Sequence, residues 1–260
     1  MRRAGKAGGH GTVAPLLPGY DVVIPCFNRA EVVADAVGSV LRQSHPAGCI
    51  VVIDDGSSDG SASVLERLAQ EHPSVLPLRL PRNGGASAAR NAGVAACRSE
   101  WIAFLDSDDL WFEDAAAALL GAAVRDGLDV AVGRFARVGP DGVAGPAECG
   151  WDGSDIRAAL RTGGVVGTSW SIVRADAVRA AGGWDPSFRT CEDWDFFVRV
   201  AATGARFGRV DRLVASYRSV AGERLIHDGA SLEAGRARVL ANPFLAGPFL
   251  ADEARRVEPA

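Results

Sequence analysis

From Tyr20 onward, short runs of β-branched residues alternate with longer alanine-rich stretches. This alternation is typical of parallel β-α-β units, in which each strand is followed by a helix that packs back against the sheet. The predicted strands are residues 21–25, 50–53, 75–80, 101–105 and 129–138, and the predicted helices are residues 31–43, 61–70, 85–96 and 113–125. Four strand-helix units in succession predict an α/β domain with a mostly parallel central sheet and flanking helices.

The regular alternation ends after Gly139, where a glycine- and proline-rich stretch runs to Trp151. Beyond it we expect helices at residues 154–160, 175–181 and 192–202, and strands at residues 169–173, 205–210 and 213–217. The residues after the last predicted strand are expected to form a weakly packed C-terminal tail. A chain of 260 residues accommodates one α/β domain with such an extension.

The charge balance excludes a nucleic-acid-binding protein. The 28 Lys and Arg residues are scattered and are outnumbered by 32 Asp and Glu residues. A protein that neutralises many phosphates needs a dense basic surface. Any phosphate recognition is therefore expected to be local.

The cysteines and the hydropathy pattern bear on the compartment. Five widely spaced cysteines contain no Cys-x-x-Cys pair, so we expect reduced thiols and a cytoplasmic protein. No apolar run approaches the roughly 20 residues that span a bilayer, so no integral membrane segment is expected. Residues 1–19 are basic and interrupted by glycine and proline, and we expect a disordered tail there.

Acidic residues follow the fourth predicted strand in the segment Asp106-Ser107-Asp108-Asp109. In an open α/β sheet, ligands bind at the carboxyl ends of the strands. Asp106 and Asp108 are two residues apart, so on an extended chain both side chains project to the same side. That spacing suits one Mn²⁺ or Mg²⁺ ion that completes its coordination with diphosphate oxygens and water. The alternative is a simple turn and helix cap, because Asp and Ser favour both.

Two neighbouring loops carry similar signals. Asp54-Asp55 follows the second strand, and one carboxylate there can accept a hydrogen bond from a nucleotide base while the other supports the loop. Asn83-Gly84-Gly85 precedes the third helix, where glycines permit close approach of the backbone to a base or phosphate. The alternatives are a capping cluster and an ordinary turn.

The second half of the chain offers a candidate base and candidate aromatic contacts. Glu192 and Asp193 begin a predicted helix, where a carboxylate can act as a general base or simply cap the helix. Trp184 and Trp194 can form a wall for a sugar or an acceptor, or can belong to the core. His227 can supply a further metal ligand from a C-terminal loop, or be an ordinary loop residue.

Taken in order, these segments resemble the family 2 glycosyltransferases, the large inverting group with the GT-A fold. The resemblance runs over roughly residues 21–217. Its motifs are Val22-Val23-Ile24-Pro25-Cys26-Phe27-Asn28-Arg29, Val52-Ile53-Asp54-Asp55-Gly56-Ser57, Asn83-Gly84-Gly85, Ala89-Arg90-Asn91-Ala92-Gly93, Phe104-Leu105-Asp106-Ser107-Asp108-Asp109, Gly182-Gly183-Trp184-Asp185 and Glu192-Asp193.

The resemblance implies a role for each motif residue. Asp55 meets the base, Asp106 lies near the ribose or diphosphate, Asp108 binds the metal and Asp193 is the catalytic base. Asp109 is left open as a further metal ligand. The remaining expected donor contacts are Pro25, Phe27, Asn28, Asp54, Gly84, Gly85, Arg90 and Ser107, and the expected acceptor contacts are Trp184, Glu192 and Trp194.

The implied activity is transfer of one sugar from a nucleotide diphosphate, with UDP the expected nucleotide, to an acceptor hydroxyl or similar nucleophile. Residues 20–139 form the donor-binding half, residues 140–220 the acceptor-binding and catalytic half, and residues 221–260 a C-terminal tail or helix. No Gln-x-x-Arg-Trp segment follows Asp193, which favours single-sugar over processive transfer. The acceptor, the sugar and a homodimeric state stay open. The rivals are a non-catalytic nucleotide-sugar-binding module and a sugar-phosphate nucleotidyltransferase.

Overall fold

The structure, a computed structural model, describes residues 16–139, 142–218 and 229–246. The strands are β1 (Tyr20–Cys26), β2 (Cys49–Asp54), β3 (Val75–Arg79), β4 (Trp101–Phe104), β5 (Leu110–Trp111), β6 (Val130–Val138), β7 (Ala144–Glu148), β8 (Ser171–Arg174) and β9 (Phe207–Arg218). The helices are α1 (Val33–Leu41), α2 (Ser61–Glu71), α3 (Ala86–Ala96), α4 (Ala115–Asp126), α5 (Ile156–Thr162), α6 (Ala175–Ala180), α7 (Glu192–Ala202), α8 (Gly229–Leu240) and α9 (Pro243–Ala246).

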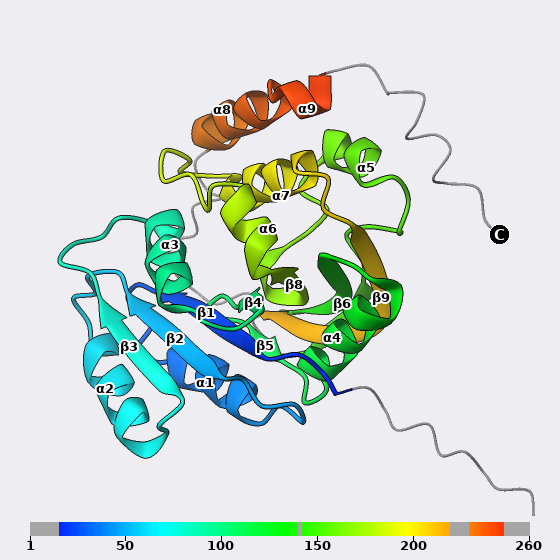
Figure 1. Ribbon diagram of the computed structural model, residues 1–260. Helices are drawn as coiled ribbons and strands as arrows, with labels where there is room; N and C mark the ends of the chain where they lie inside the picture. The colour runs from blue at the N-terminus through cyan, green and yellow to red at the C-terminus, as the bar shows by residue number, and fades with distance from the viewer. Residues whose placement is uncertain (1–15, 140–141, 219–228, 247–260) are drawn as a thin grey trace, which may run out of the picture.

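All the strands belong to one mixed sheet, which the helices flank (Figure 1). Its order is β3-β2-β1-β4-β8-β6-β9-β5, with β7 paired to β6. The first four strands in this order are parallel to one another, as the β-α-β pattern predicts. β8 then runs antiparallel to both β4 and β6, whereas β9 is parallel to β6. The expected α/β class is confirmed, with a parallel half and a mixed half in one sheet.

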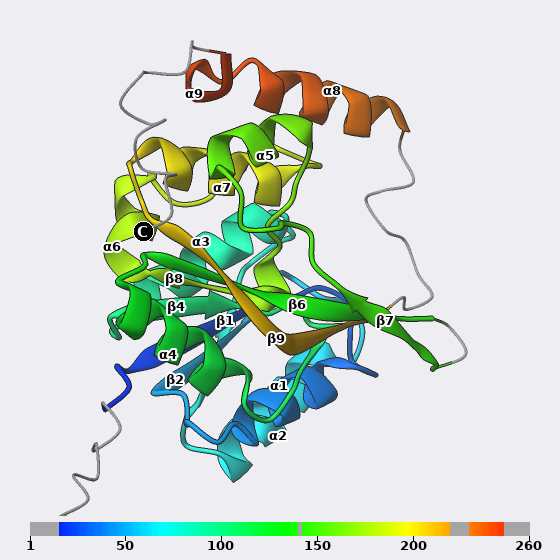
Figure 2. The same cartoon turned by 90° about the vertical axis from the view of Figure 1, so that its right-hand side faces the viewer.

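Each face of the sheet has its own core because successive strand residues point to opposite sides. Val22 and Ile24 of β1 pack with residues of α1, α2 and α4. Val23 packs on the other side with residues of α3, α6 and α7. Gly93 of α3 allows close contact there, since a Cβ at this position would lie 2.4 Å from Val23 Cγ1. The helices α8 and α9 form an outer layer over α7 and α5 (Figure 2).

Five details differ from the pattern-based expectations, the first being the short strand β5, which was not predicted and pairs with β9. The two expected strands 205–210 and 213–217 are one strand, β9, whose pairing with β6 shifts register around Arg134. The expected strand 169–173 begins as a 3₁₀ turn, Thr168–Trp170, and becomes β8 afterwards. β7 lies within the glycine- and proline-rich stretch. The segment expected to pack weakly contains α8 and α9, whose Val239 and Leu245 are buried.

Part of the expected N-terminal tail, residues 1–15, lies outside the described residues. Among the helices that the structure does describe, none is long and apolar enough to cross a membrane.

Candidate active site

The sheet order brings the acidic strand ends together. β1 lies between β2 and β4, and all three strands run in the same direction. The loops that begin at Asp54 and Leu105 therefore flank the end of β1 at one edge of the sheet. This is the edge at which open parallel sheets bind ligands.

Backbone N–H groups hold the two carboxylates after β2. Asp54 Oδ1 accepts from the Ser57 N–H at 2.9 Å, closing a turn. Asp55 Oδ1 and Oδ2 accept from the N–H groups of Gly84 and Gly85, both at 2.8 Å. Burial raises the pKa of Asp55, and these two bonds oppose the rise. Asp55 thus ties the loop after β2 to the loop after β3.

The end of β1 presents an exposed aromatic ring beside this loop. Phe27 is 41% exposed, whereas Pro25 is half-buried. Asn28 follows with φ 51°, its N–H donating to Ser57 Oγ and its side-chain oxygen accepting from the Ser58 N–H, each at 2.9 Å. Ring and amide are therefore fixed next to the Asp54-Asp55 turn.

The segment after β4 forms a turn in which two of the acids are already engaged. Asp106 accepts from Arg90 Nη2 at 2.8 Å and from Thr168 Oγ1 at 3.2 Å. Asp109 is 1% exposed and accepts from Ser169 Oγ at 2.6 Å and from the Arg218 N–H at 3.0 Å. Burial, together with the charges of Asp106 and Asp108, raises the pKa of Asp109 well above its ordinary value. Asp109 is therefore less accessible to a cation than Asp108. Ser107, which follows Asp106, is also buried.

Asp108 differs from the enclosed Asp109 because its side chain is 20% exposed, and the Asp106 side chain is 32% exposed. Its Oδ2 lies 3.9 Å from Arg29 Nε, and its backbone oxygen accepts from Arg218 Nε at 2.7 Å. No group of three or more His, Cys, Asp or Glu side chains within the described residues is arranged to hold a metal ion. The residues instead fit a divalent cation that is bound by one or two carboxylates and whose coordination is completed by substrate phosphates and water.

Arg90 connects this turn to the second half of the chain. The guanidinium is 3% exposed, and it contacts Asp106 at 2.8 Å and Glu192 Oε1 at 3.3 Å. It also lies 4.4 Å from the centre of the Trp184 ring. Burial alone would lower the pKa of Arg90, but the charges of Asp106 and Glu192 outweigh it and raise the pKa. One buried cation thus joins the β4 loop to the start of α7.

Asp193 stands beside Glu192 in the first turn of α7. Its Oδ1 accepts from the Trp194 N–H at 2.7 Å. Burial and the neighbouring charge of Glu192 raise the pKa of Asp193 to about 7, although the Trp194 N–H and Arg90 lower it. A carboxyl group with such a pKa can take up a proton near neutral pH, which general base catalysis requires.

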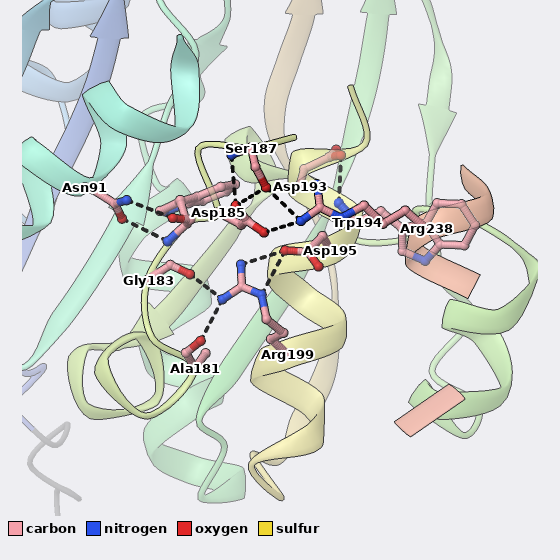
Figure 3. Close-up of polar contacts among 11 residues, drawn as sticks. Asn91, Ala181, Gly183, Asp185, Ser187, Asp193, Trp194, Asp195, Arg199 and Arg238 are labelled. Atoms are coloured by element: carbon pink, nitrogen blue, oxygen red, sulfur yellow. Dashed lines mark hydrogen bonds and ion pairs between the residues drawn. The ribbon is translucent and has the colours of Figure 1, made fainter. Parts of the chain in front are cut away.

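The loop that leads into α7 is held by side chains from three other segments (Figure 3). Asn91 exchanges two hydrogen bonds, both of 2.8 Å, with the backbone of Trp184. Arg199 pairs with Asp195 at 2.7 Å and donates to the backbone oxygens of Ala181 and Gly183. The third is Arg238 of α8, which bonds to Asp185 and Ser187. These contacts fix the approach of the chain to Asp193.

Backbone strain marks both sides of the site. Among the described residues, Asn28 and Cys191 are the non-glycine residues with positive φ, at 51° and 61°. Asn28 is hydrogen-bonded to the turn of Ser57 and Ser58, and Cys191 is the N-cap of α7, two residues before Asp193. Non-glycine residues in this region cluster at functional sites, where surrounding contacts hold them.

The structure places both tryptophans in the core. Trp184 is 2% exposed, and its ring stacks on Phe196 with centroids 4.1 Å apart. Trp194 is 4% exposed and donates from Nε1 to the Leu160 oxygen at 2.8 Å. Neither ring offers an open face to an acceptor, and the Trp184 ring instead packs against the Arg90 guanidinium. This is the core alternative that the sequence left open.

Several residues of this site were not predicted as site residues. Thr168 and Ser169, from the second half of the chain, contact the Asp106–Asp109 turn, and no local sequence pattern predicts these contacts. Arg199 and Arg238 look like ordinary helix-surface arginines in the sequence. Asn91 lies in a recognised motif, directly after Arg90, and was the one with a usable signal. His227 lies outside the described residues.

Comparisons with known proteins agree on one family. The family model described as Glycosyl transferase family 2 matches residues 21–151. The chain is 36% identical over 97 residues to the putative teichuronic acid biosynthesis glycosyltransferase TuaG of Bacillus subtilis, covering 37% of this chain and 38% of that protein. It is 30% identical over 210 residues to the succinoglycan biosynthesis protein ExoA of Rhizobium meliloti, covering 75% of this chain and 62% of that protein. The match thus spans less than two thirds of either relative.

Among solved structures, S. aureus TarS 1-349 in complex with UDP-GlcNAc superimposes with a TM-score of 0.69 at 17% identity. The match covers 90% of this chain and 77% of that one. A second crystal structure, the same fragment in complex with UDP, gives a TM-score of 0.65. The expected GT-A fold is thereby confirmed.

Proposed function

The chain belongs to glycosyl transferase family 2 and is a glycosyltransferase, and from this premise we propose its reaction. The enzyme moves a single sugar from a nucleotide diphosphate, UDP, onto an acceptor hydroxyl or similar nucleophile, with inversion and with the help of a divalent cation. The names of the relatives and the bound ligands of the TarS structures support a UDP donor and a role in cell-surface glycan biosynthesis. Natural-product biosynthesis is the other setting in which such a transfer occurs.

The donor binds at the strand-end loops of residues 20–139. Asp55 accepts a hydrogen bond from the base N–H. Each of its oxygens already accepts one backbone N–H and retains a second lone pair for this bond. The exposed ring of Phe27 packs on the base, flanked by Pro25 and Asn28. Asp54, Gly84 and Gly85 shape the loops, and Arg90 and Ser107 hold the Asp106 turn beside the ribose and diphosphate.

Mn²⁺ or Mg²⁺ would be held by Asp108, with Asp106 kept in place next to it by Arg90 and Thr168. A bound ion of this kind neutralises the charge that develops on the leaving diphosphate. The solvent-accessible carboxylate of Asp108 supports this choice, because the neighbouring Asp109 is enclosed.

Asp193 acts as the general base on the acceptor side, residues 140–220. It removes the proton of the acceptor hydroxyl while the acceptor oxygen forms its bond to the anomeric carbon and the bond to the diphosphate breaks. The proton ends on Asp193, and the sugar configuration is inverted in this single displacement. Base assistance of this kind contributes about 10²–10⁴-fold to the rate. Glu192 does not take the proton, and its contact with Arg90 orients the start of α7.

The observation that best supports this function is the position of the buried Arg90 between the Asp106 turn on the donor side and the start of α7, where the proposed base lies. Arg90 contacts Asp106 at 2.8 Å and Glu192 at 3.3 Å, so the Asp106 turn and the start of α7 form one polar unit. A nucleotide-binding module without chemistry has no need of this link. The five free cysteines support our further proposal of a cytoplasmic location.

Hydrolysis of a panel of nucleotide sugars with Mn²⁺, with water as the acceptor, tests the proposal. We expect turnover of one or more UDP-sugars by the wild type and a fall of about 10²-fold or more in Asp193→Asn, with UDP binding retained. Asp176→Asn, at a carboxylate that is 86% exposed on α6, is the control and should match the wild type. Equal turnover in Asp193→Asn would remove Asp193 from the mechanism. UDP binding without turnover of any sugar would favour the non-catalytic module.

A further inference from the structure

A cavity of about 200 Å³ lies between α8 and the loop that leads into α7. The loop contributes Phe188, Arg189 and Thr190 to its wall, and α8 contributes Ser231, Gly235 and Arg238. None of these residues belongs to the donor site described above. The cavity is therefore a separate hollow, on the acceptor side of the molecule.

The two walls are fixed to each other by short contacts. Thr190 Oγ1 donates to the Ser231 oxygen at 2.8 Å. Gly235 lets α8 approach closely, because a Cβ there would lie 2.7 Å from Thr190 Oγ1. Arg238 bonds to Asp185 and to Ser187 Oγ, both at 2.7 Å, and its guanidinium carbon lies 3.9 Å from the centre of the Phe188 ring. Figure 3 shows Arg238 reaching from α8 to these loop residues.

Positive charge gathers at and beside this cavity: Arg189 and Arg238 line it, and Arg236 is next to the lining residue Gly235 on α8. Arg189 is exposed and, within the described residues, has no hydrogen-bond or ion-pair partner. Arg236 of α8 is also exposed and likewise has no such partner within the described residues. Arg236 follows Gly235, where a Cβ would lie 3.3 Å from Cys191 Sγ, so this turn of α8 lies against the N-cap of α7. The nearby Asp185 is already paired with Arg238. A guanidinium presents a fork of donors that matches phosphate and carboxylate oxygens.

The cavity also lies beside the candidate base along the chain. Thr190 in its wall is followed by Cys191, Glu192 and Asp193. The cavity therefore borders the first turn of α7, in which Asp193 lies. The donor loops end at the other side of Arg90, so the occupant that suits the cavity is the acceptor.

We propose that this cavity is a subsite for an acidic group of the acceptor, a phosphate or a carboxylate, bound by Arg189 and Arg236 beside the fixed Arg238. The proposal rests on the function proposed above, since it names the acceptor class of that same enzyme. An acceptor that carries such a group would be anchored at α8 while its nucleophilic hydroxyl reaches Asp193.

Inorganic phosphate is the probe, added to the full chain saturated with UDP and Mn²⁺ so that the donor site is filled. Ligand binding to the folded state raises the unfolding temperature with the logarithm of concentration over Kd, which yields an apparent Kd for phosphate. We expect Arg189→Ala and Arg236→Ala each to weaken this Kd by about tenfold, the scale of one charge-assisted contact. Sodium acetate at matched ionic strength distinguishes a carboxylate preference from a phosphate preference.

Arg161→Ala is the matched control, because Arg161 is exposed on α5 and has no partner among the described residues. It should bind phosphate like the wild type, and all three variants should bind UDP with unchanged affinity. UDP binding together with a phosphate Kd that is insensitive to Arg189 and Arg236 would overturn the subsite alone. Absence of UDP binding in the wild type would instead overturn the proposed function. Gly235→Ser, which crowds Thr190, should weaken phosphate binding independently of charge, and unchanged binding there would also contradict the proposal.

Discussion

The two sides of the candidate site hold their acids by different means. At the strand ends, Asp54 and Asp55 accept hydrogen bonds from backbone N–H groups of the loops. Around α7, arginines hold three of the acids: Arg238 of α8 holds Asp185, Arg90 of α3 holds Glu192, and Arg199 of α7 itself holds Asp195 and the preceding loop. Arginines also contact two strand-end acids, Arg79 at Asp54 and Arg90 at Asp106, so the difference is one of emphasis: backbone donors hold Asp55, whereas side chains hold Asp185, Glu192 and Asp195.

This difference has a consequence for the response to substitution. Backbone donors are placed once the loop has its conformation, so the strand-end side depends on glycines that allow that conformation. An arginine side chain loses up to about 2 kcal/mol of rotamer entropy when it is fixed. The α7 side therefore depends on a few long side chains, each of which supports several groups at once.

The largest expected effect is the loss of an arginine on the α7 side. Arg199→Gln leaves Asp195, 6% exposed, without its ion pair and removes the donor from two backbone oxygens. We expect the free energy of unfolding, measured in urea, to fall by about 3 kcal/mol, the range for breaking a buried pair. Arg179→Gln removes an exposed helix pair with Asp176 and should cost less than about 0.5 kcal/mol. Equal losses in the two variants would erase the contrast between the two sides.

The strand-end counterpart is Asp55→Ala. It removes the acceptor of the Gly84 and Gly85 N–H groups, which solvent can partly satisfy because both residues are at least partly exposed. We expect a loss of about 2 kcal/mol in unfolding free energy, from two charge-assisted bonds that are partly replaced by water. UDP titration should show weakened binding as well. A variant that loses stability but binds UDP normally would confine Asp55 to a structural role.

A pair of glycine substitutions sharpens the comparison. An alanine Cβ at Gly56, where φ is 72°, would lie 2.8 Å from the Arg82 backbone carbon, whereas at Gly183, where φ is 73°, it would meet the Asn91 side-chain oxygen at 2.7 Å. Backbone cannot yield easily but a side chain can, so we expect Gly56→Ala to cost about 2 kcal/mol and Gly183→Ala about 1 kcal/mol. Gly182→Ala, with open space around the Cβ, isolates the cost of φ itself. Thermal and urea unfolding of the three variants should rank them in that order.

The smallest expected effect is the pH dependence of the base. Because the pKa of Asp193 is raised to about 7, the active carboxylate form increases by about threefold between pH 6.5 and 7.5, and kcat should rise with it. The same shift affects folding with the opposite sign. The folded state binds the proton more tightly, so this contribution to stability is full below about pH 4 and is lost as pH rises through 7. Asp193→Asn should flatten both profiles, and an unchanged stability profile would assign the effect to another group.

The strand-end half of the site could be predicted because its signals are local. Apolar periodicity predicted the strands and helices from Tyr20 to residue 126 except the short strand β5, and the Asp106 and Asp108 spacing needed only the strand direction. The partners of Asp109 could not be predicted in this way. Ser169 is 60 residues away in the sequence and Arg218 is 109 away, and neither belongs to a pattern.

The tryptophans illustrate the same limit from the other side of the site. Trp184 sits between Phe104 of β4 and Phe196 of α7, with ring centroids 5.0 and 4.1 Å away. A wall for a sugar and a core position require the same residue type, and only the arrangement of distant elements separates them. Likewise, the apolar residues of α8 form no clear stripe along one face, so the pattern does not predict that the helix packs against the α7 loop.

The outer layer of α8 and α9 contributes no strand to the sheet and covers α7 and α5 from outside (Figure 2). A segment attached in this manner can be exchanged between related enzymes without disturbing strand pairing. Chimeras that keep residues up to Tyr217 and replace the C-terminal helices should retain their nucleotide preference while acquiring the acceptor range of the donor of those helices. On the acceptor subsite proposed above, α8 would then change the acceptor range while the nine-stranded sheet stays the same.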